Sequence, residues 1–156
     1  MAAKPDSGEK LIASNKKAFH DYFVLQKFEA GLALTGTEVK SLRAGRANLK
    51  DSYVTFKDGE AYLLGAHISP YTHGNLQNHE PERTRKLLLH RREIEKLHVE
   101  ATEKGLTIVP LRLYFKGGKV KAEIAVVKGK KQYDKRETER AREADREAAR
   151  AVKERG

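Results

Sequence analysis

Hydrophobic and polar residues alternate along several stretches of this chain, as expected for strands with one buried face. In the stretch 119–128, for example, Val120, Ala122 and Ile124 fall on one face. Asp58-Gly59 and Gly117-Gly118 interrupt two long apolar-rich stretches, and both dipeptides suit tight hairpin turns. The pattern therefore predicts a first strand and two hairpins, with strands over 21–28, 53–57, 60–64, 106–116 and 119–128.

Three segments have a helical rather than an alternating pattern. Residues 16–20 predict a short helical turn, and residues 38–44 predict a helix with Thr35 or Thr37 as N-cap and Gly45 as its stop. Residues 91–104 place apolar side chains and His98 on one face, with Gly105 following. We therefore expect a mainly β fold with accessory helices, a small antiparallel barrel of the oligonucleotide-binding (OB) type, over residues 16–128.

Three irregularities qualify this prediction. Glu29-Ala30-Gly31 is expected to interrupt the first strand, and Pro110 predicts an edge or bulge position because proline cannot donate to a ladder. Residues 1–15 contain Pro5-Asp6-Ser7-Gly8 and are expected to be a flexible lead.

The C-terminal segment, 129–156, differs in composition from the rest. From 128 to 156 there are 11 Lys/Arg and 7 Asp/Glu with hardly a large apolar residue, so the segment cannot bury itself in a core. Acid-first pairs three residues apart recur along it, as in Glu143/Arg146. A helix polar nearly all round is marginal alone in water, so we expect a basic tail that is disordered when free and helical when bound.

Charge favours a polyanionic partner. The 156 residues carry a net charge of +10, contain no cysteine, and include no apolar run long enough to span a bilayer. We expect a cytoplasmic protein without a membrane segment. Basic clusters accompanied by rings suggest phosphate contacts and base stacking. The residues chosen on these grounds are Lys16, Lys17, His20, Tyr22, Lys128, Lys130 and Lys131, and further basic clusters occur at Lys40/Arg43/Arg46, Arg83/Arg85/Lys86 and Arg91-Arg92.

Catalytic chemistry has little support. The six histidines are scattered without a metal-ligand spacing, and His98 suits a core or rim position better than a ligand role. No nucleophile-elbow, Walker or dinucleotide-binding motif is present. We expect no enzyme activity, no metal and no cofactor.

Long and compositionally unusual segments resemble the SsrA-binding protein family, also called small protein B. They extend in order from about residue 15 to 136, beginning with Asn15-Lys16-Lys17-Ala18. The most specific are GTEVKSLRAG at 36–45 and GKKQYDKR at 129–136, with TRKLLL at 84–89 between them. The resemblance implies an OB-type barrel that binds the tRNA-like domain of transfer-messenger RNA and delivers it to stalled ribosomes for trans-translation. It also implies a monomer without catalytic activity, linked through the RNA to alanyl-tRNA synthetase and elongation factor Tu.

The resemblance assigns RNA binding to Glu29, Leu88 and Lys121. Lys121 lies on the outward face of its predicted strand, where it can meet phosphate. Glu29 can accept hydrogen bonds from a base or ribose, or it can form a structural salt bridge. At least one leucine of 87–89 should be core, so Leu88 is expected to act indirectly, through the shape of the barrel.

The resemblance also assigns the tail to the vacant messenger channel of the ribosome. Tyr133, Asp134, Lys135 and Arg136 match the segment near the decoding centre, and relatives carry His where this chain has Tyr133. A tyrosine can stack on a base, but it does not supply an imidazole that gains a proton near neutral pH. The alternative function left open is a ribosomal or ribosome-assembly protein that binds ribosomal RNA with the same barrel.

Overall fold

The computed structural model describes residues 8–71 and 78–130. Within them, seven antiparallel strands form one sheet in the order β1-β8-β9-β2-β7-β5-β4, and two short strands pair separately. The seven are β1 (Glu9–Ser14), β8 (Thr107–Lys116), β9 (Lys119–Gly129), β2 (Tyr22–Leu32), β7 (Arg85–Leu88), β5 (Glu60–Leu64) and β4 (Tyr53–Lys57); the separate pair is β3 (Ala47–Asn48) and β6 (His67–Ile68).

The sheet curls into a barrel, because β4 at one end of the strand order also contacts β8 near the other end. Its interior is filled by alternating apolar residues of the long strands, including Leu63, Leu87, Leu113 and Ile124, each at most 1% exposed. The predicted antiparallel barrel is therefore confirmed. The alternation of residues predicted it because each strand buries one face in the same core.

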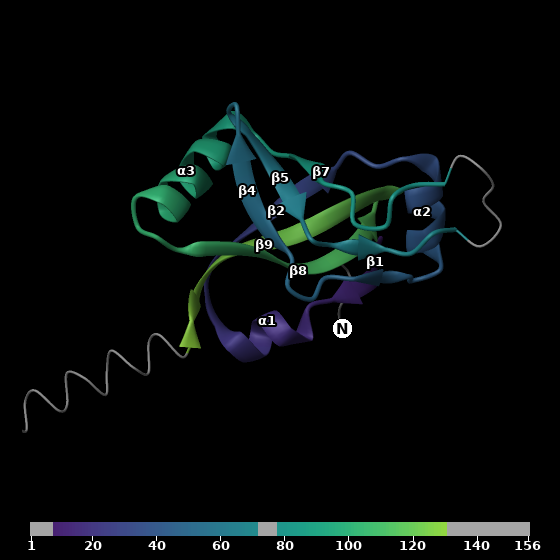
Figure 1. The fold of residues 1–156 in the computed structure, drawn as a ribbon, viewed down its shortest axis with the longest axis horizontal. Coiled ribbons are helices and arrows are strands. Elements are labelled where there is room, and N and C mark those ends of the chain that lie inside the picture. Colours follow the sequence, from purple (N-terminus) through teal and green to yellow (C-terminus); the bar gives the residue numbers. More distant parts are fainter. Residues whose placement is uncertain (1–7, 72–77, 131–156) are drawn as a thin grey trace, which may run out of the picture.

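Three helices surround the barrel: α1 (Lys16–Asp21), α2 (Gly36–Arg43) and α3 (Arg91–Thr102). Figure 1 shows α2 and α3 near opposite ends of the molecule and α1 on a third side. α2 begins after Thr35, which forms a capping box with Glu38, and Gly45 follows it with a φ of 71°. All three predicted helices are present, within a few residues of their predicted ends.

Both predicted hairpins are confirmed by the backbone of their turns. Asp58 and Gly59 have φ values of 52° and 77°, and Gly117 and Gly118 have 58° and 77°. Two consecutive positive φ values are what a type I′ turn requires, and its twist matches that of the strands it joins.

Two sequence predictions need correction, and a third is confirmed. Residues 9–14 are not part of a flexible lead: they form β1, which pairs with β8. Glu29-Ala30-Gly31 does not interrupt its strand, since β2 continues to Leu32; the irregularity is a register shift between Val24 and Gln26. The prediction for Pro110 is confirmed: the register of β8 with β9 shifts between Pro110 and Arg112, and β1 pairs with β8 only from Arg112 onward.

A buried asparagine joins α1 to the barrel. Asn15 is 4% exposed, and its Oδ1 accepts a hydrogen bond from the Ala18 amide at 3.1 Å, which caps α1. Its Nδ2 donates to the carbonyl oxygens of Pro110, at 2.8 Å, and Leu49, at 3.3 Å. The side chain therefore holds α1 over a small outer apolar cluster of Ala18, Val109, Leu111, Ala125 and Val127.

Replacing this residue tests the junction. Asn15→Asp is expected to lower the free energy of unfolding by about 1–3 kcal/mol, because a carboxylate still caps α1 but cannot donate to the two buried carbonyls. Urea unfolding followed by circular dichroism measures the loss. Asn48→Asp is the control: its side chain is exposed and accepts from the Lys50 amide, which a carboxylate can also do. Equal losses in both variants would contradict the assigned role of Asn15.

Candidate nucleic-acid interface

The structure brings Glu29, Leu88 and Lys121 together around one hollow of about 540 Å³. They come from three neighbouring strands, β2, β7 and β9. Gly31 of β2 pairs with Leu88 on one side and with Lys121 on the other, and Glu29 lies two residues earlier on the same face. We call this the central hollow; it is also lined by Glu60, Lys86, Leu87, Leu89, His90 and Glu93.

Gly31 lets Leu88 lie across the floor of the central hollow. A Cβ at position 31 would lie 3.3 Å from the Cβ of Leu88, closer than most side chains tolerate. Leu88 is 52% exposed, whereas its neighbour Leu87 is fully buried and occupies the core position predicted for this leucine triplet. The Leu88 side chain is therefore available for direct contact, and its action through the shape of the barrel stays a prediction.

Glu29 is held in place by two donors. Its Oε2 accepts hydrogen bonds from the Tyr114 hydroxyl at 2.5 Å and from Lys116 Nζ at 3.2 Å. The hydrogen bond from Tyr114 lowers the pKa of Glu29 below its usual value, and Lys116 lowers it further. Burial acts in the opposite direction but is the weaker effect. The carboxylate therefore forms the predicted salt bridge while its side chain remains 39% exposed, and its hydrogen bonding to RNA stays a prediction.

Tyr114 is a neighbour of Glu29 that the sequence did not reveal. It is 3% exposed although it belongs to the outward face of β8, and burial together with the Glu29 hydrogen bond raises its pKa. Arg112 covers its ring, with the guanidinium carbon 4.9 Å from the ring centre. Tyr114 lies 85 residues from Glu29 in the chain, and only the pairing of β2, β9 and β8 brings them together.

Beside the central hollow, the charges of the outward face are largely paired. Arg112 Nη2 lies 3.0 Å from Glu123 Oε2, and Lys27 Nζ lies 3.9 Å from Glu123 Oε1. Within residues 8–71 and 78–130, Lys121 forms no such ion pair. An incoming phosphate can therefore meet this lysine of the hollow without breaking an ion pair.

The other predicted RNA-binding residues form a second surface around α1, here called the α1 surface. It contains Lys16, Lys17, His20, Tyr22, Lys128 and Lys130. Lys17 Nζ lies 2.6 Å from Asp51, whose hydrogen bond raises the lysine pKa, and His20 Nδ1 lies 2.9 Å from Asp21. Lys130 Nζ donates to the Phe19 carbonyl and lies 5.4 Å from the centre of the Phe23 ring.

The exposed rings of this second surface were not among the predicted RNA-binding residues. Phe19 and Phe23 are each about 40% exposed, and Lys128 lies opposite Phe23 in the β2–β9 register. Tyr22 is half-buried, because part of its side chain packs against the cluster beneath α1. The predictions for Lys131, Tyr133, Asp134, Lys135 and Arg136 lie outside the described residues.

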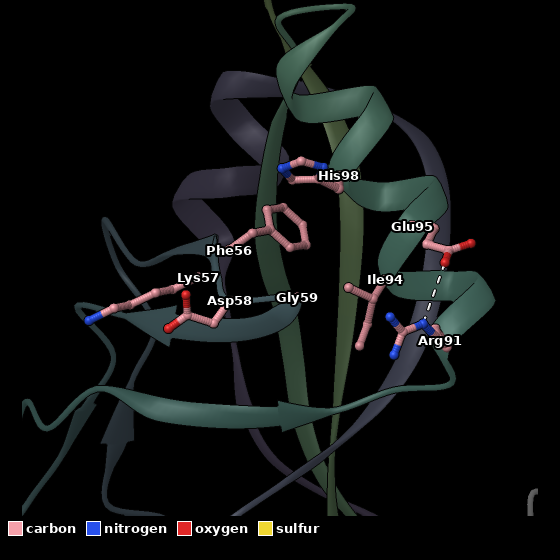
Figure 2. A pocket seen from close by; sticks show the side chains of 8 residues that line it. All are labelled: Phe56, Lys57, Asp58, Gly59, Arg91, Ile94, Glu95 and His98. Carbon is pink, nitrogen blue, oxygen red and sulfur yellow. Dashed lines mark ion pairs between the residues drawn. The ribbon is translucent and has the colours of Figure 1, made fainter.

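A further pocket lies between the β4–β5 hairpin and α3 (Figure 2). Phe56 and His98 meet edge to face there, with ring centres 5.2 Å apart, which places His98 at the rim as predicted. Its charged residues are balanced: Lys57 and Asp58 lie on the hairpin, and Arg91 lies 3.6 Å from Glu95 on α3. This balance gives the pocket no preference for an anion.

The described part of the chain holds no group of three or more His, Asp or Glu residues placed to bind a metal ion. None of its helices is long and apolar enough to cross a membrane.

Known proteins of one family are similar to this chain over nearly its whole length. Residues 12–154 match the family model described as SmpB protein. The chain is 60% identical to a protein named SsrA-binding protein from Pelobacter propionicus, over 94% of this chain and 96% of that one. A protein of the same name from Geobacter metallireducens is 59% identical, over 95% and 97%. Among solved structures, a chain in "tmRNA-SmpB: a journey to the center of the bacterial ribosome" matches with a TM-score of 0.66 and 47% identity, covering 76% of this chain and 83% of that one.

Proposed function

The chain belongs to the SmpB protein family, and from this membership we propose that it binds the tRNA-like domain of transfer-messenger RNA and delivers that RNA to stalled ribosomes. The observation that carries the proposal is the meeting of Glu29, Leu88 and Lys121 in the central hollow. In this reading the protein is a cytoplasmic monomer without catalysis of its own, and the RNA links it to alanyl-tRNA synthetase and elongation factor Tu.

Lys121, Leu88 and Glu29 have distinct roles in the proposed complex. Lys121 neutralises a phosphate, and the exposed Leu88 packs against a sugar or an unstacked base. The Glu29 carboxylate, oriented by Tyr114 and Lys116, accepts hydrogen bonds from base amines or the ribose 2′-hydroxyl. The combination of a charge, an apolar contact and an acceptor suits single-stranded RNA loops better than a uniform duplex.

The α1 surface and the tail supply further contacts in this proposal. Lys16, Lys17, His20, Tyr22, Lys128, Lys130 and Lys131 contact RNA through charge and stacking. Residues 133–136 reach the decoding centre, and the helix-forming part of the tail lies in the vacant messenger channel, where it tests that no message is present.

Sequencing the RNA bound to the protein in cells tests the proposal. Affinity capture of the full-length chain is expected to enrich one transfer-messenger RNA species, and capture with a Lys121→Gln variant should lose most of that enrichment. Enrichment of bulk ribosomal RNA, equal for both proteins, would contradict the proposal and support a role in ribosome assembly.

Lys121→Gln also has a quantitative consequence in vitro. The variant is expected to bind the tRNA-like domain several-fold more weakly, and its plot of log K against log salt should be shallower by about one unit for the lost phosphate contact. Fluorescence anisotropy with labelled tRNA-like domain measures both quantities. Lys104→Gln is the matched control, since Lys104 pairs with Glu100 on α3; an equal change in the control would contradict the phosphate contact.

A further inference from the structure

The central hollow continues into a second hollow toward α2. This distal hollow has a volume of about 320 Å³ and shares Gly31, Leu88 and Lys121 with the central one. Its other lining residues include Leu34, Val39 and Lys119. Because the two hollows have three residues in common, they form one groove that runs from the start of α3 to α2.

The wall of the distal hollow on α2 carries an arginine beside its apolar lining. The side of α2 that faces the barrel is buried and consists of Glu38, Ser41 and Leu42. Val39 lines the hollow, and Arg43, four residues later and therefore adjacent to it on the helix surface, is exposed. The helix thus presents an apolar residue and a cation side by side at the end of the groove.

Charge differs between the two ends of the groove. At the α3 end, Lys86 Nζ lies 3.5 Å from Glu60 Oε2, and Glu29 is paired with Lys116. At the α2 end, Lys119 and Arg43 are exposed, and neither forms an ion pair with any residue in the described ranges. The distal hollow is therefore lined by apolar groups together with Lys119 and Lys121, and the exposed Arg43 lies one helical turn beyond its lining residue Val39.

We propose that the RNA held in the central hollow continues through the distal hollow, where Lys119 and Arg43 contact its phosphates and Leu34 and Val39 pack against a sugar or base. The inference rests on the proposed function in that the same RNA occupies both hollows. Their continuity through Leu88 and Lys121 favours RNA over any separate occupant of the α2 end. Leu88, exposed between the two hollows, then lies beneath the middle of the bound strand.

The double variant Arg43→Gln/Lys119→Gln tests the inference. Binding of labelled tRNA-like domain is measured by fluorescence anisotropy between about 0.05 and 0.3 M salt. A plot of log K against log salt has a slope of about 0.7–0.9 units for each phosphate contact, so the slope counts these contacts. We expect binding to weaken roughly tenfold at low salt and the slope to fall by about 1.4–1.8 units. The charge-retaining variant Arg43→Lys/Lys119→Arg is expected to bind within about twofold of the unmodified chain.

The matched control is Lys57→Gln/Lys104→Gln, which removes the same charge from two exposed residues that line neither hollow. An equal loss in this control, or an unchanged slope in the Arg43/Lys119 variant when Lys121→Gln does weaken binding, would overturn the inference. Displacement of the RNA by polyglutamate as readily as by unlabelled RNA would also overturn it, because an acidic peptide would then be an equal occupant.

Failure of the proposed function gives a different result. If the chain prefers 16S ribosomal RNA to the tRNA-like domain, the same variants are measured on that RNA. If Arg43→Gln/Lys119→Gln lowers the salt slope of binding to 16S ribosomal RNA, the extended groove is supported. The proposed function is contradicted by the same result. If the chain binds neither RNA, both are overturned.

Discussion

Glu38→Ala is expected to lower the free energy of unfolding by about 3–5 kcal/mol, the cost of leaving a buried charge without its partner. Glu38 and Arg85 are both fully buried, and the Arg85 Nε donates to Glu38 Oε2 at 2.5 Å. A loss of this size is a large part of the stability of a small domain. Urea unfolding at pH 7 measures it.

The reason for the large effect is a network that joins three segments. Glu38 Oε1 accepts from Arg83 Nη2 at 2.7 Å and from the Thr35 amide at 2.8 Å. Arg85 also donates to the carbonyl oxygens of Ala66, at 2.9 Å, and Pro81, at 3.0 Å. The pair therefore fastens the start of α2 to β7 and to the chain segments beside β6.

Two comparisons separate the buried charge from other effects. Glu60→Ala removes an exposed carboxylate whose nearest cation, Lys86, is 3.5 Å away, and should cost no more than about 1 kcal/mol. The double variant Glu38→Met/Arg85→Met should cost less than Glu38→Ala, because no charge is left unpaired in the core. Similar losses for Glu38→Ala and Glu60→Ala would contradict the role assigned to the network.

The same network makes the free energy of unfolding depend on pH in the acidic range. Burial alone would raise the pKa of Glu38, but hydrogen bonds from Arg83, the Thr35 amide and Arg85 outweigh it and hold the pKa at about 2, compared with 4.5 for an ordinary glutamate. Because the folded pKa is the lower one, the stabilisation is complete above about pH 4.5 and is lost as the pH falls towards 2. Unfolding measured across this range should show a smaller pH dependence in the double methionine variant.

Deleting residues 132–156 is expected to abolish tagging of stalled translation products while affinity for the tRNA-like domain stays within about twofold. The deleted segment has 8 Lys/Arg and 7 Asp/Glu, so its removal changes the net charge of the chain by only one unit. The proposed groove lies entirely within the residues retained. Anisotropy gives the affinity, and translation of a message without a stop codon, in an extract lacking the native protein, gives the tagging.

Lys121→Gln is the reciprocal control for the deletion. The Lys121→Gln variant should have a lower RNA affinity, and its tagging should fall only in proportion to that affinity. Raising the concentration of this variant should therefore restore tagging, whereas raising the concentration of the truncated chain should not. Loss of RNA affinity on truncation with tagging intact would contradict the division of labour between barrel and tail.

Local patterns predicted most of the fold. Asp58-Gly59 and Gly117-Gly118 adopt the positive φ values that their hairpins require, and Thr35 and Gly45 mark the limits of α2. Errors occurred where a partner strand overrides the local pattern. Residues 9–14 lack the alternation of apolar and polar positions that predicts a strand, yet the free edge of β8 pairs with them.

The sequence by itself determined the class of the protein: a basic chain with alternating strands, turn dipeptides and family motifs, all of which depend on neighbouring residues. The tertiary structure decided which of these residues share a surface. Glu29, Leu88 and Lys121 meet only because β2 pairs with both β7 and β9, and the fixation of Glu29 by Tyr114 requires β8 as well. Glu38 and Arg85, 47 residues apart, become a buried pair only when α2 packs on the barrel. Contacts across such distances depend on strand register and burial, which a pattern of neighbouring residues does not contain.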